Sequence, residues 1–243
     1  MSDPAFATPG ADLRPLLPAV RDQGQRGTCL AFAVTAAHEL ARAAGAAGAA
    51  GAAVAEDLSE EALYWGCKVV DGNWRSGSRC ASAATALAAT GQPLEAVWPY
   101  DPARLAGTAY APPTPPTADW YRSGLATTPI DAADIRTEIE SGRPVLLGVT
   151  VFDTFFRPVG GRIEAPATTD PARGGHAVLA VGHDAGALLI RNSWGTTWAL
   201  AGYAWLSDEY TAGHLREAWV IQAATTGTPQ ASGAPIGDIY ESH

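Results

Sequence analysis

Four polar side chains, far apart in the sequence, are of the types that acyl-transfer chemistry needs. The first is Cys29, in the stretch QGQRGTCLAFA, where a small-residue apolar run predicts a helix that begins at the cysteine. The free N–H groups at a helix N-terminus favour a thiolate, and the thiolate is the reactive nucleophile. Position alone does not separate this thiol from an inert buried one, so the chain must also supply a base and its partners.

His176 is the best candidate base among the five histidines. It follows two glycines and opens HAVLAVGH, which predicts a strand that places the imidazole at a sheet end. The run ALLIRNSW predicts a second strand, and the intervening DAG predicts a hairpin. This hairpin brings Asn192 beside His176, where the amide can orient the ring and Trp194 can shield the hydrogen bond. Taken singly, Asn192 would be interpreted as a turn residue and Trp194 as a core aromatic residue.

Gln23 lies six residues before Cys29 and supplies a side-chain amide. Its N–H₂ group and the backbone N–H of Cys29 could both point at the oxygen that becomes negative during attack on an acyl carbon. A surface glutamine in a loop is the alternative interpretation.

The elements that must position these residues fall into two halves. Apolar periodicity and caps predict helices over 29–45, 57–70, 79–91 and 130–142, with a flexible glycine–alanine loop over 45–57. Asp57 or Ser59 is expected to cap the second helix and Asp131 the fourth, and Gly91 is expected to end the third. Strand-like runs follow at 143–152, 176–183, 187–194, 202–207 and 217–224. Helices before strands indicate an α+β chain in two lobes. We expect a loose leader at 1–11, a domain at 12–224 divided near 110/111, and a flexible tail at 225–243.

The composition narrows the function class. The chain has 243 residues, a net charge of −9 and only 16 Lys and Arg, which argues against nucleic acid as a partner. No apolar run is long enough to span a bilayer, and no secretory signal is visible. Three cysteines without an export signal favour the cytoplasm, with Cys67 and Cys80 as buried free thiols rather than a pair. The cysteine and histidine spacings predict neither a metal nor another cofactor.

These features together resemble the papain-like cysteine peptidases. QGQRGTCLAF is similar to the nucleophile segment of that family, GGHAVLAVGH to its histidine segment and IRNSWGTTWALAGYAWLS to its asparagine segment. LSEEALYWGC and WPY resemble two landmarks between them, and the order Cys, His, Asn fits. The resemblance implies a helical lobe, a β-barrel-like lobe and an active site in the cleft between them.

The resemblance also implies amide hydrolysis through an acyl-thioester on a protein or peptide substrate. It makes Cys29 the nucleophile, His176 the acid and base, Asn192 the orienter and Gln23 the oxyanion donor. The remaining site residues carry implied supporting roles: Trp194 as a shield, Trp198 on the leaving-group side, and Ala177, Gly175 and Gly77 at the substrate.

Two departures from the family pattern bear on the nucleophile segment. Arg26 stands where the family has a disulfide cysteine, which agrees with a reducing compartment, and Leu30 stands where it has an aromatic residue. The double glycine that binds substrate backbone is unclear, with Gly72 and Gly77 both candidates. No inhibitory propeptide is visible, so we expect a stand-alone bacterial type of enzyme.

Two other functions remain open from the sequence. A transpeptidase or ligase would use the same acyl-enzyme with an amine in place of water. A binding module on an inactive scaffold would explain Leu30 and the unclear glycine pair. The sequence also leaves open an inhibitory or activating protein partner.

Overall fold

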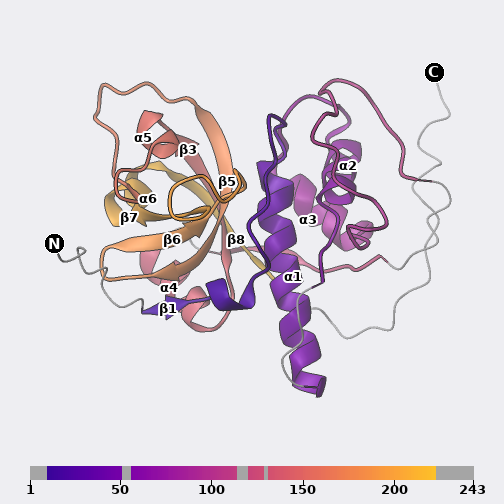
Figure 1. Cartoon of the computed structure of the whole chain (residues 1–243), viewed down its shortest axis with the longest axis horizontal. Helices are drawn as coiled ribbons and strands as arrows, with labels where there is room; N and C mark the ends of the chain where they lie inside the picture. The colour runs from indigo at the N-terminus through magenta and orange to yellow at the C-terminus, as the bar shows by residue number, and fades with distance from the viewer. Residues whose placement is uncertain (1–9, 51–55, 114–119, 129–130, 223–243) are drawn as a thin grey trace.

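The computed structural model describes residues 10–50, 56–113, 120–128 and 131–222, which form two lobes (Figure 1). Three helices make up the first lobe: α1 (Cys29–Ala50), α2 (Glu60–Asp71) and α3 (Cys80–Ala89). A mostly antiparallel sheet makes up the second, and α1 packs against its strand β5 (Gly174–His183). The predicted α+β fold, with helices first and strands second, is confirmed.

Three predicted helix boundaries agree with the structure. Ser59 and Asp131 cap α2 and α4 (Ala132–Glu140) by accepting a hydrogen bond from a backbone N–H in the first turn. After α3, Gly91 adopts a φ of +81°, and its N–H reaches the carbonyl of Ala86. Side-chain oxygens therefore open these helices and a left-handed glycine closes one, as the sequence predicts.

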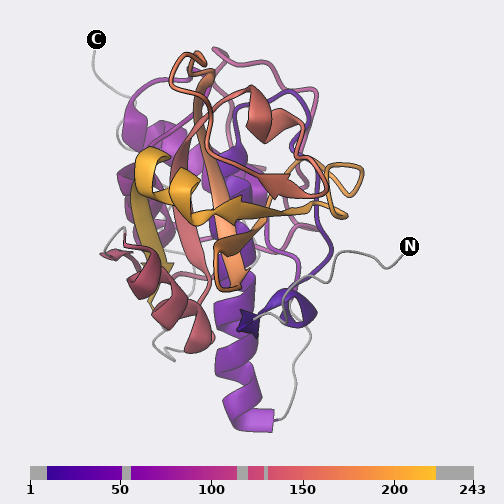
Figure 2. The same ribbon diagram turned by 90° about the vertical axis from the view of Figure 1, so that its left-hand side faces the viewer.

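Helix α1 is longer than the sequence predicts. The repeat at 45–57 was expected to be a loop, but the helix continues through it to Ala50. Each residue added to an existing helix gains a hydrogen bond without a new nucleation step, so the alanines outweigh the glycines between them. The last turns of α1 project beyond both lobes in two perpendicular views (Figures 1 and 2).

The sheet of the second lobe has eight strands in the order β2-β8-β3-β5-β6-β7-β4, with β1 paired to β5 beside this path. The strand bounds are β1 Ala11–Asp12, β2 Leu125–Thr128, β3 Val145–Val151, β4 Arg162–Ile163, β6 Ala187–Arg191, β7 Tyr203–Ser207 and β8 Leu215–Ile221. Only the pairing of β4 with β7 is parallel among these strands. Three short helices were not predicted: η1 (Arg14–Leu16), α5 (Asp153–Phe156) and α6 (Asp208–His214).

The β5–β6 hairpin is the part of the sheet that organises the site. Its strands pair antiparallel across a turn at 184–186, as the DAG signal predicts. His176 lies near the start of β5 and Asn192 directly after the end of β6, so the hairpin brings the two residues together.

The first residues that the structure describes are bonded to the sheet. Gly10 and Ala11 were expected to be part of a loose leader, but they bond to β5: Gly10 N–H reaches the carbonyl of His183 at 2.8 Å, and Ala11 pairs with His183. The rest of that leader, the end of the predicted loop and the predicted tail lie outside the described residues. Within the described residues, none of the helices has the length and apolarity needed to cross a membrane.

Candidate active site

Cys29 is the first residue of α1, and its thiol faces the other lobe. Burial opposes ionisation of this thiol, but the charge and hydrogen bond of His176 outweigh burial and lower the pKa of Cys29. Backbone N–H groups of Ala177 and Leu30 hydrogen-bond the sulfur and act in the same direction. The site therefore holds a thiol predisposed to ionise, next to an imidazole.

The His176 imidazole lies between Cys29 and Asn192. Its Nε2 is 2.8 Å from Asn192 Oδ1, and that oxygen also accepts the backbone N–H of Ser193 at 2.8 Å. Because Oδ1 accepts, Nε2 must carry a proton, and this leaves Nδ1 for the sulfur. Burial would lower the pKa of His176, yet the charge of Cys29 and the hydrogen bonds with Cys29 and Asn192 raise it overall.

Aromatic rings cover the histidine–asparagine contact. The ring of Trp194 lies 4.7 Å from that of His176, centroid to centroid, and Phe156 stacks on the outer side of Trp194 at 5.4 Å. Phe155 meets the His176 ring edge to face at 5.6 Å. The sequence does not reveal the two phenylalanines as site residues, because the short helix α5 (Asp153–Phe156) that carries them has no clear sequence signal.

Trp198 lies behind this cover rather than on the cavity wall. It is only 9 % exposed, and it stacks on Phe155 and meets Trp194 edge to face. These contacts pack the support of Trp194, and the place of Trp198 on the leaving-group side, which the resemblance implies, stays a prediction.

Gln23 is fixed beside the nucleophile segment. Its Nε2 donates to the carbonyl of Arg26 at 2.7 Å, and its Oε1 accepts from the hydroxyl of Ser193. The side chain is buried, and its backbone N–H also bonds to the Ser193 carbonyl at 2.8 Å. One of the two amide protons is committed to Arg26, and the other has no hydrogen-bond acceptor among the described residues.

A cavity of about 190 Å³ opens beside Cys29 and His176, with walls from both lobes. Three residues expected at the substrate, namely Gly77, Gly175 and Ala177, line it. Cys80, Gly148, Val149, Arg216 and Glu217 also line it and were not identified from the sequence. The one sequence signal among them is Glu217, an acidic residue that opens the last predicted strand. Such a residue is equally typical of a strand end exposed to solvent.

Arg26 braces the loop before Cys29. Its guanidinium bonds Glu61 of α2 through both terminal nitrogens and also donates to the carbonyl of Asp101 at 2.7 Å. It stacks over Tyr100 and Tyr64, with 4.7 and 5.4 Å to the ring centroids, and its side chain is 8 % exposed. A buried bidentate ion pair therefore occupies the place where the family pattern has a disulfide cysteine.

A second ionic brace holds the Gly77 loop. The Lys68 ammonium donates to Asp71 Oδ2 at 2.8 Å and to the carbonyl of Gly77 at 2.7 Å. The hydroxyls of Ser78 and Ser82 donate to the same Asp71 carboxylate. This network fixes the wall of the cavity opposite the histidine.

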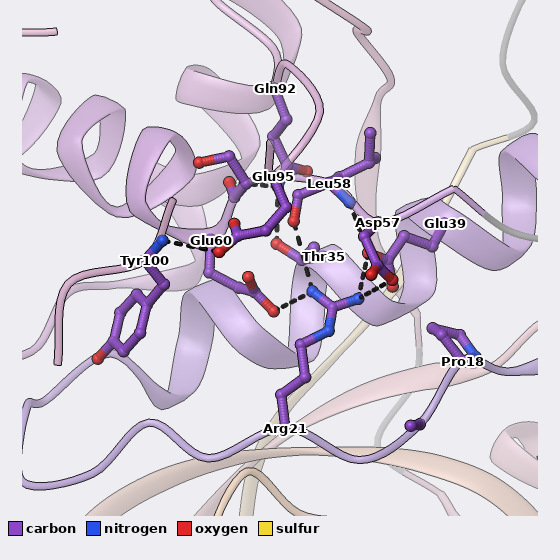
Figure 3. A network of polar contacts seen from close by, with 12 residues as sticks. Pro18, Arg21, Thr35, Glu39, Asp57, Leu58, Glu60, Gln92, Glu95 and Tyr100 are labelled. Atoms are coloured by element: carbon purple, nitrogen blue, oxygen red, sulfur yellow. Dashed lines mark hydrogen bonds and ion pairs between the residues drawn. The ribbon is translucent and has the colours of Figure 1, made fainter. Parts of the chain in front are cut away.

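Arg21 ties the segment before Gln23 to the helical lobe (Figure 3). Its guanidinium bonds Glu39 of α1 and Glu60 of α2, with Asp57 further away at 3.3 Å. Burial raises the pKa of Glu60 to about 8, Arg21 opposes this shift, and the charges of Glu39 and Glu95 add to it. The single positive charge of Arg21 thus faces three carboxylates, and the raised pKa of Glu60 favours its protonated, neutral form.

The same segment is also tied to the sheet. Arg191 at the end of β6 donates to the carbonyl of Ala19 at 2.7 Å and to that of Pro18. Because residues 18–21 bond to both lobes, the backbone that leads to Gln23 is held at the boundary between them.

The other two thiols differ from Cys29 in the direction of their pKa shift. Cys67 and Cys80 are buried and free of disulfides, as expected. Burial raises the pKa of both, so their thiols stay protonated. No group of three or more potential metal ligands occurs in the described part of the chain.

A thiol on a helix of one lobe, facing an imidazole and an amide on the sheet of the other, defines the class of two-lobed cysteine peptidases. A family model described as papain family cysteine protease matches residues 10–222, and the chain belongs to this family.

Solved structures of similar fold come from bacteria and plants. Xylellain, a cysteine protease from Xylella fastidiosa, superposes with a TM-score of 0.75 at 25 % identity, covering 93 % of this chain and 95 % of that one. The Carica candamarcensis cysteine protease CMS1MS2, solved in complex with E-64, gives a TM-score of 0.66 at 23 % identity and supports the fold alone; it covers 88 % of this chain and 98 % of that one.

Two curated relatives match over part of their length. Cysteine proteinase 3 of Entamoeba histolytica is 28 % identical over 214 residues, which is 84 % of this chain and 64 % of the relative. An uncharacterized peptidase C1-like protein, L477, of Acanthamoeba polyphaga mimivirus is 33 % identical over 98 residues, which is 37 % of this chain and 32 % of the relative. The chain therefore spans less than two thirds of the length of either.

Proposed function

We propose that this protein is a cysteine peptidase that hydrolyses peptide bonds through Cys29, His176 and Asn192. The single observation that supports this most is the contact of His176 with Cys29 on one side and with Asn192 on the other, since that contact lowers the pKa of the thiol and raises that of the imidazole. A thiolate–imidazolium pair is both the attacking group and the proton source of such a reaction.

The reaction follows from the positions of these atoms. The Cys29 thiolate attacks the peptide carbonyl carbon, and the carbonyl oxygen takes the negative charge. The free N–H of Gln23 and the backbone N–H of Cys29, one of the unbonded donors at a helix start, stabilise that oxygen. His176 gives its Nδ1 proton to the leaving amine, and an acyl-thioester remains on Cys29.

The second half of the reaction uses the same imidazole as a base. Neutral His176 takes a proton from water, the hydroxide attacks the thioester, and the acid product leaves as the thiolate forms again. Asn192 keeps the His176 ring in one orientation through both steps, while Trp194 shields the His176–Asn192 hydrogen bond from water.

The substrate is proposed to be a peptide or protein segment lying in the cavity. Gly77, Gly175 and Ala177 line it, and their small side chains allow a substrate backbone to approach closely. We propose one peptidase domain over 12–224, with the two lobes divided near 110/111.

We also infer a reducing, cytoplasmic location and a bacterial origin. Three free thiols and Arg26 in the place of a disulfide cysteine support the first. The 25 % identity with xylellain over nearly the whole of both chains supports the second.

The test replaces the nucleophile. Cys29→Ala should lower kcat/KM on a fluorogenic peptide library by at least roughly a thousandfold, and a thiol-directed epoxide should label Cys29 alone in the unmodified protein. Cys67→Ala, a change at a core thiol remote from the cavity, is the matched control and should keep the labelling. Labelling at Cys80, or at no cysteine, would contradict the proposal.

A further inference from the structure

A second and much smaller cavity, here called the inner cavity, lies at the boundary between the lobes. Its volume is about 10 Å³, which is enough for one water molecule. Both lobes supply its walls: Phe32, Ala33 and Ala36 of α1 and Glu60 of α2 on one side, and Ala177, Leu179, Arg191, Asn192 and Ser193 on the other, with Arg21 between them. One wall of the inner cavity is therefore the residue that orients His176.

Two buried polar atoms in these walls have no hydrogen-bond partner among the described residues. Glu60 is 2 % exposed and bonds Arg21 through Oε1 (Figure 3), while its Oε2 is unpartnered. Asn192 is 3 % exposed, and its Oδ1 accepts from His176 and from the backbone N–H of Ser193, while its Nδ2 is unpartnered. Because unpaired polar atoms are costly inside a protein, a small polar occupant is favoured here.

The protonation of Glu60 identifies the occupant. Burial raises the pKa of Glu60, which favours the neutral acid, and since Oε1 accepts from Arg21 the proton lies on Oε2. Oε2–H and the Nδ2–H of Asn192 are then both donors, which cannot bond each other but can both donate to one water oxygen. The Ser193 hydroxyl, whose own proton goes to Gln23, can accept from that water. The other charged groups beside Glu60 or in the walls are Arg21, Glu39, Asp57, Glu95 and Arg191.

We propose that the inner cavity holds one water molecule, and that Glu60 is a positioning residue which fixes this water against the amide of Asn192. This rests on the proposed peptidase function. An amide that donates at its nitrogen becomes a better acceptor at its oxygen, because hydrogen bonds in a chain polarise one another. Asn192 Oδ1 then holds the Nε2 proton of His176 more firmly. Hydrogen bonds therefore connect Glu60 in the helical lobe to the imidazole in the other lobe.

Two variants remove the water in different ways. Glu60→Leu removes the group that fixes it, and Ala36→Val fills the inner cavity without changing any polar or charged group. Glu60→Gln keeps an acceptor for Arg21 and offers an N–H in place of the Oε2 proton, so it should rescue the loss seen with leucine. Ala37→Val, at a buried position of α1 that does not line the inner cavity, is the matched control for Ala36→Val.

The first measurement is the pKa of His176, followed by NMR in the Cys29→Ala background so that no turnover is needed. Glu60→Leu and Ala36→Val should each lower this pKa by roughly 0.3 unit, since polarisation changes a charge-assisted hydrogen bond by about 10–30 %. Glu60→Gln and Ala37→Val should keep the pKa within about 0.1 unit. With Cys29 present, the alkaline limb of the kcat/KM profile should move in the same direction.

The second measurement is a high-resolution crystal structure of the unmodified protein and of Ala36→Val. We expect a water within hydrogen-bond distance of Glu60 Oε2 and Asn192 Nδ2 in the first and none in the second. Both measurements would support the inference even if no peptide is hydrolysed. It would be overturned by an empty inner cavity in the unmodified protein, by an unmoved His176 pKa in either water-removing variant that folds, or by an equal shift in Ala37→Val.

Discussion

Cys29 and Cys80 occupy similar places in this protein. Each is the first residue of a helix, and both line the cavity between the lobes. Burial opposes ionisation of both thiols, yet the pKa of Cys29 is lowered while that of Cys80 is raised. The difference is the neighbour: the imidazole of His176 faces Cys29, whereas the carboxylate of Glu217 faces Cys80. A helix N-terminus alone therefore does not make a thiol reactive, and the charge opposite it decides the direction.

The two ends of the cavity are braced in similar ways. Arg26 and Glu61 fix the loop that leads to Cys29, and Lys68 and Asp71 fix the loop that leads to Cys80. Buried ion pairs with further hydrogen bonds hold a loop in one geometry, but each member becomes costly once its partner is removed. Variants that remove the charged group opposite a thiol, or the ion pair that fixes its loop, therefore test why the pKa values of Cys29 and Cys80 shift in opposite directions.

The largest expected effect comes from removing the opposing imidazole. His176→Ala should raise the pKa of Cys29 toward its ordinary range or above it, because burial then acts without compensation. We expect kcat/KM to fall by roughly 10⁴, the upper range for loss of a general acid–base group. Iodoacetamide labelling near neutral pH, read at each cysteine by mass spectrometry, should drop at Cys29 to the level of Cys80.

The control for this prediction is His38→Ala. His38 is buried further along α1, where its Nδ1 meets Gln92 Oε1 at 2.9 Å, and it is not among the groups that shift the pKa of Cys29. That variant tests for general loss of structure and should leave Cys29 preferentially labelled. Undiminished labelling of Cys29 in His176→Ala would mean that the helix start, not the imidazole, lowers its pKa.

The brace of the Cys29 loop should give the next largest effect. Among the residues that the structure describes, Arg26→Met leaves the buried Glu61 with Arg104, at 3.2 Å, as its one remaining cation. We expect the free energy of unfolding to fall by about 3 kcal/mol, the lower range for breaking a buried pair. Urea unfolding measures the loss, and Cys29 should also lose its preferential labelling as the loop loosens.

A double change distinguishes a lost ion pair from lost packing. Adding Glu61→Gln to Arg26→Met removes the uncompensated charge and should restore part of the stability. A loss below about 1 kcal/mol in the single variant would be typical of an exposed pair and would show that Arg26 does not brace the loop.

The sequence predicts those parts of the fold and of the site whose signals lie within a few residues of one another. Ser59, Asp131 and Gly91 act within one turn of chain, and the helix boundaries they predict are the observed ones. The turn signal at 184–186 fixes a hairpin, and the hairpin register then brings His176 to Asn192. Local chemistry and short-range pairing therefore carry these parts of the prediction.

The parts that were not predicted depend on long-range packing. Glu217 reaches the cavity because a bulge in the pairing of β3 with β8 lets β8 present two successive residues there. Cys80 reaches it because α3 packs against β2, which is paired with β8. Arg26 could be seen to replace a cysteine, but its partner Glu61 lies 35 residues further along the chain. The motif that carries Trp198 does not reveal that its ring stacks on Phe155, which comes from a separate short helix.

The smallest of these effects comes from loosening the imidazole without removing it. Asn192→Ala removes the acceptor of His176 Nε2–H, which should weaken catalysis by roughly 5- to 150-fold, since leaving such a group unpaired costs about 1–3 kcal/mol. The hydrogen bond to Asn192 is one of the causes that raise the pKa of His176. Its loss should therefore lower that pKa and bring the alkaline limb of the kcat/KM profile to lower pH.

The direction of this pH shift separates an orienting amide from a merely structural one. The active pair forms as pH rises through the pKa of Cys29 and is lost as pH rises through that of His176, so the profile is bell-shaped. Asn192→Gln, which keeps an amide on a longer side chain, should recover part of the alkaline limb, whereas Asn192→Ala should not. A fall in kcat/KM with both limbs unmoved would mean that Asn192 supports the fold around His176 but does not hold its proton.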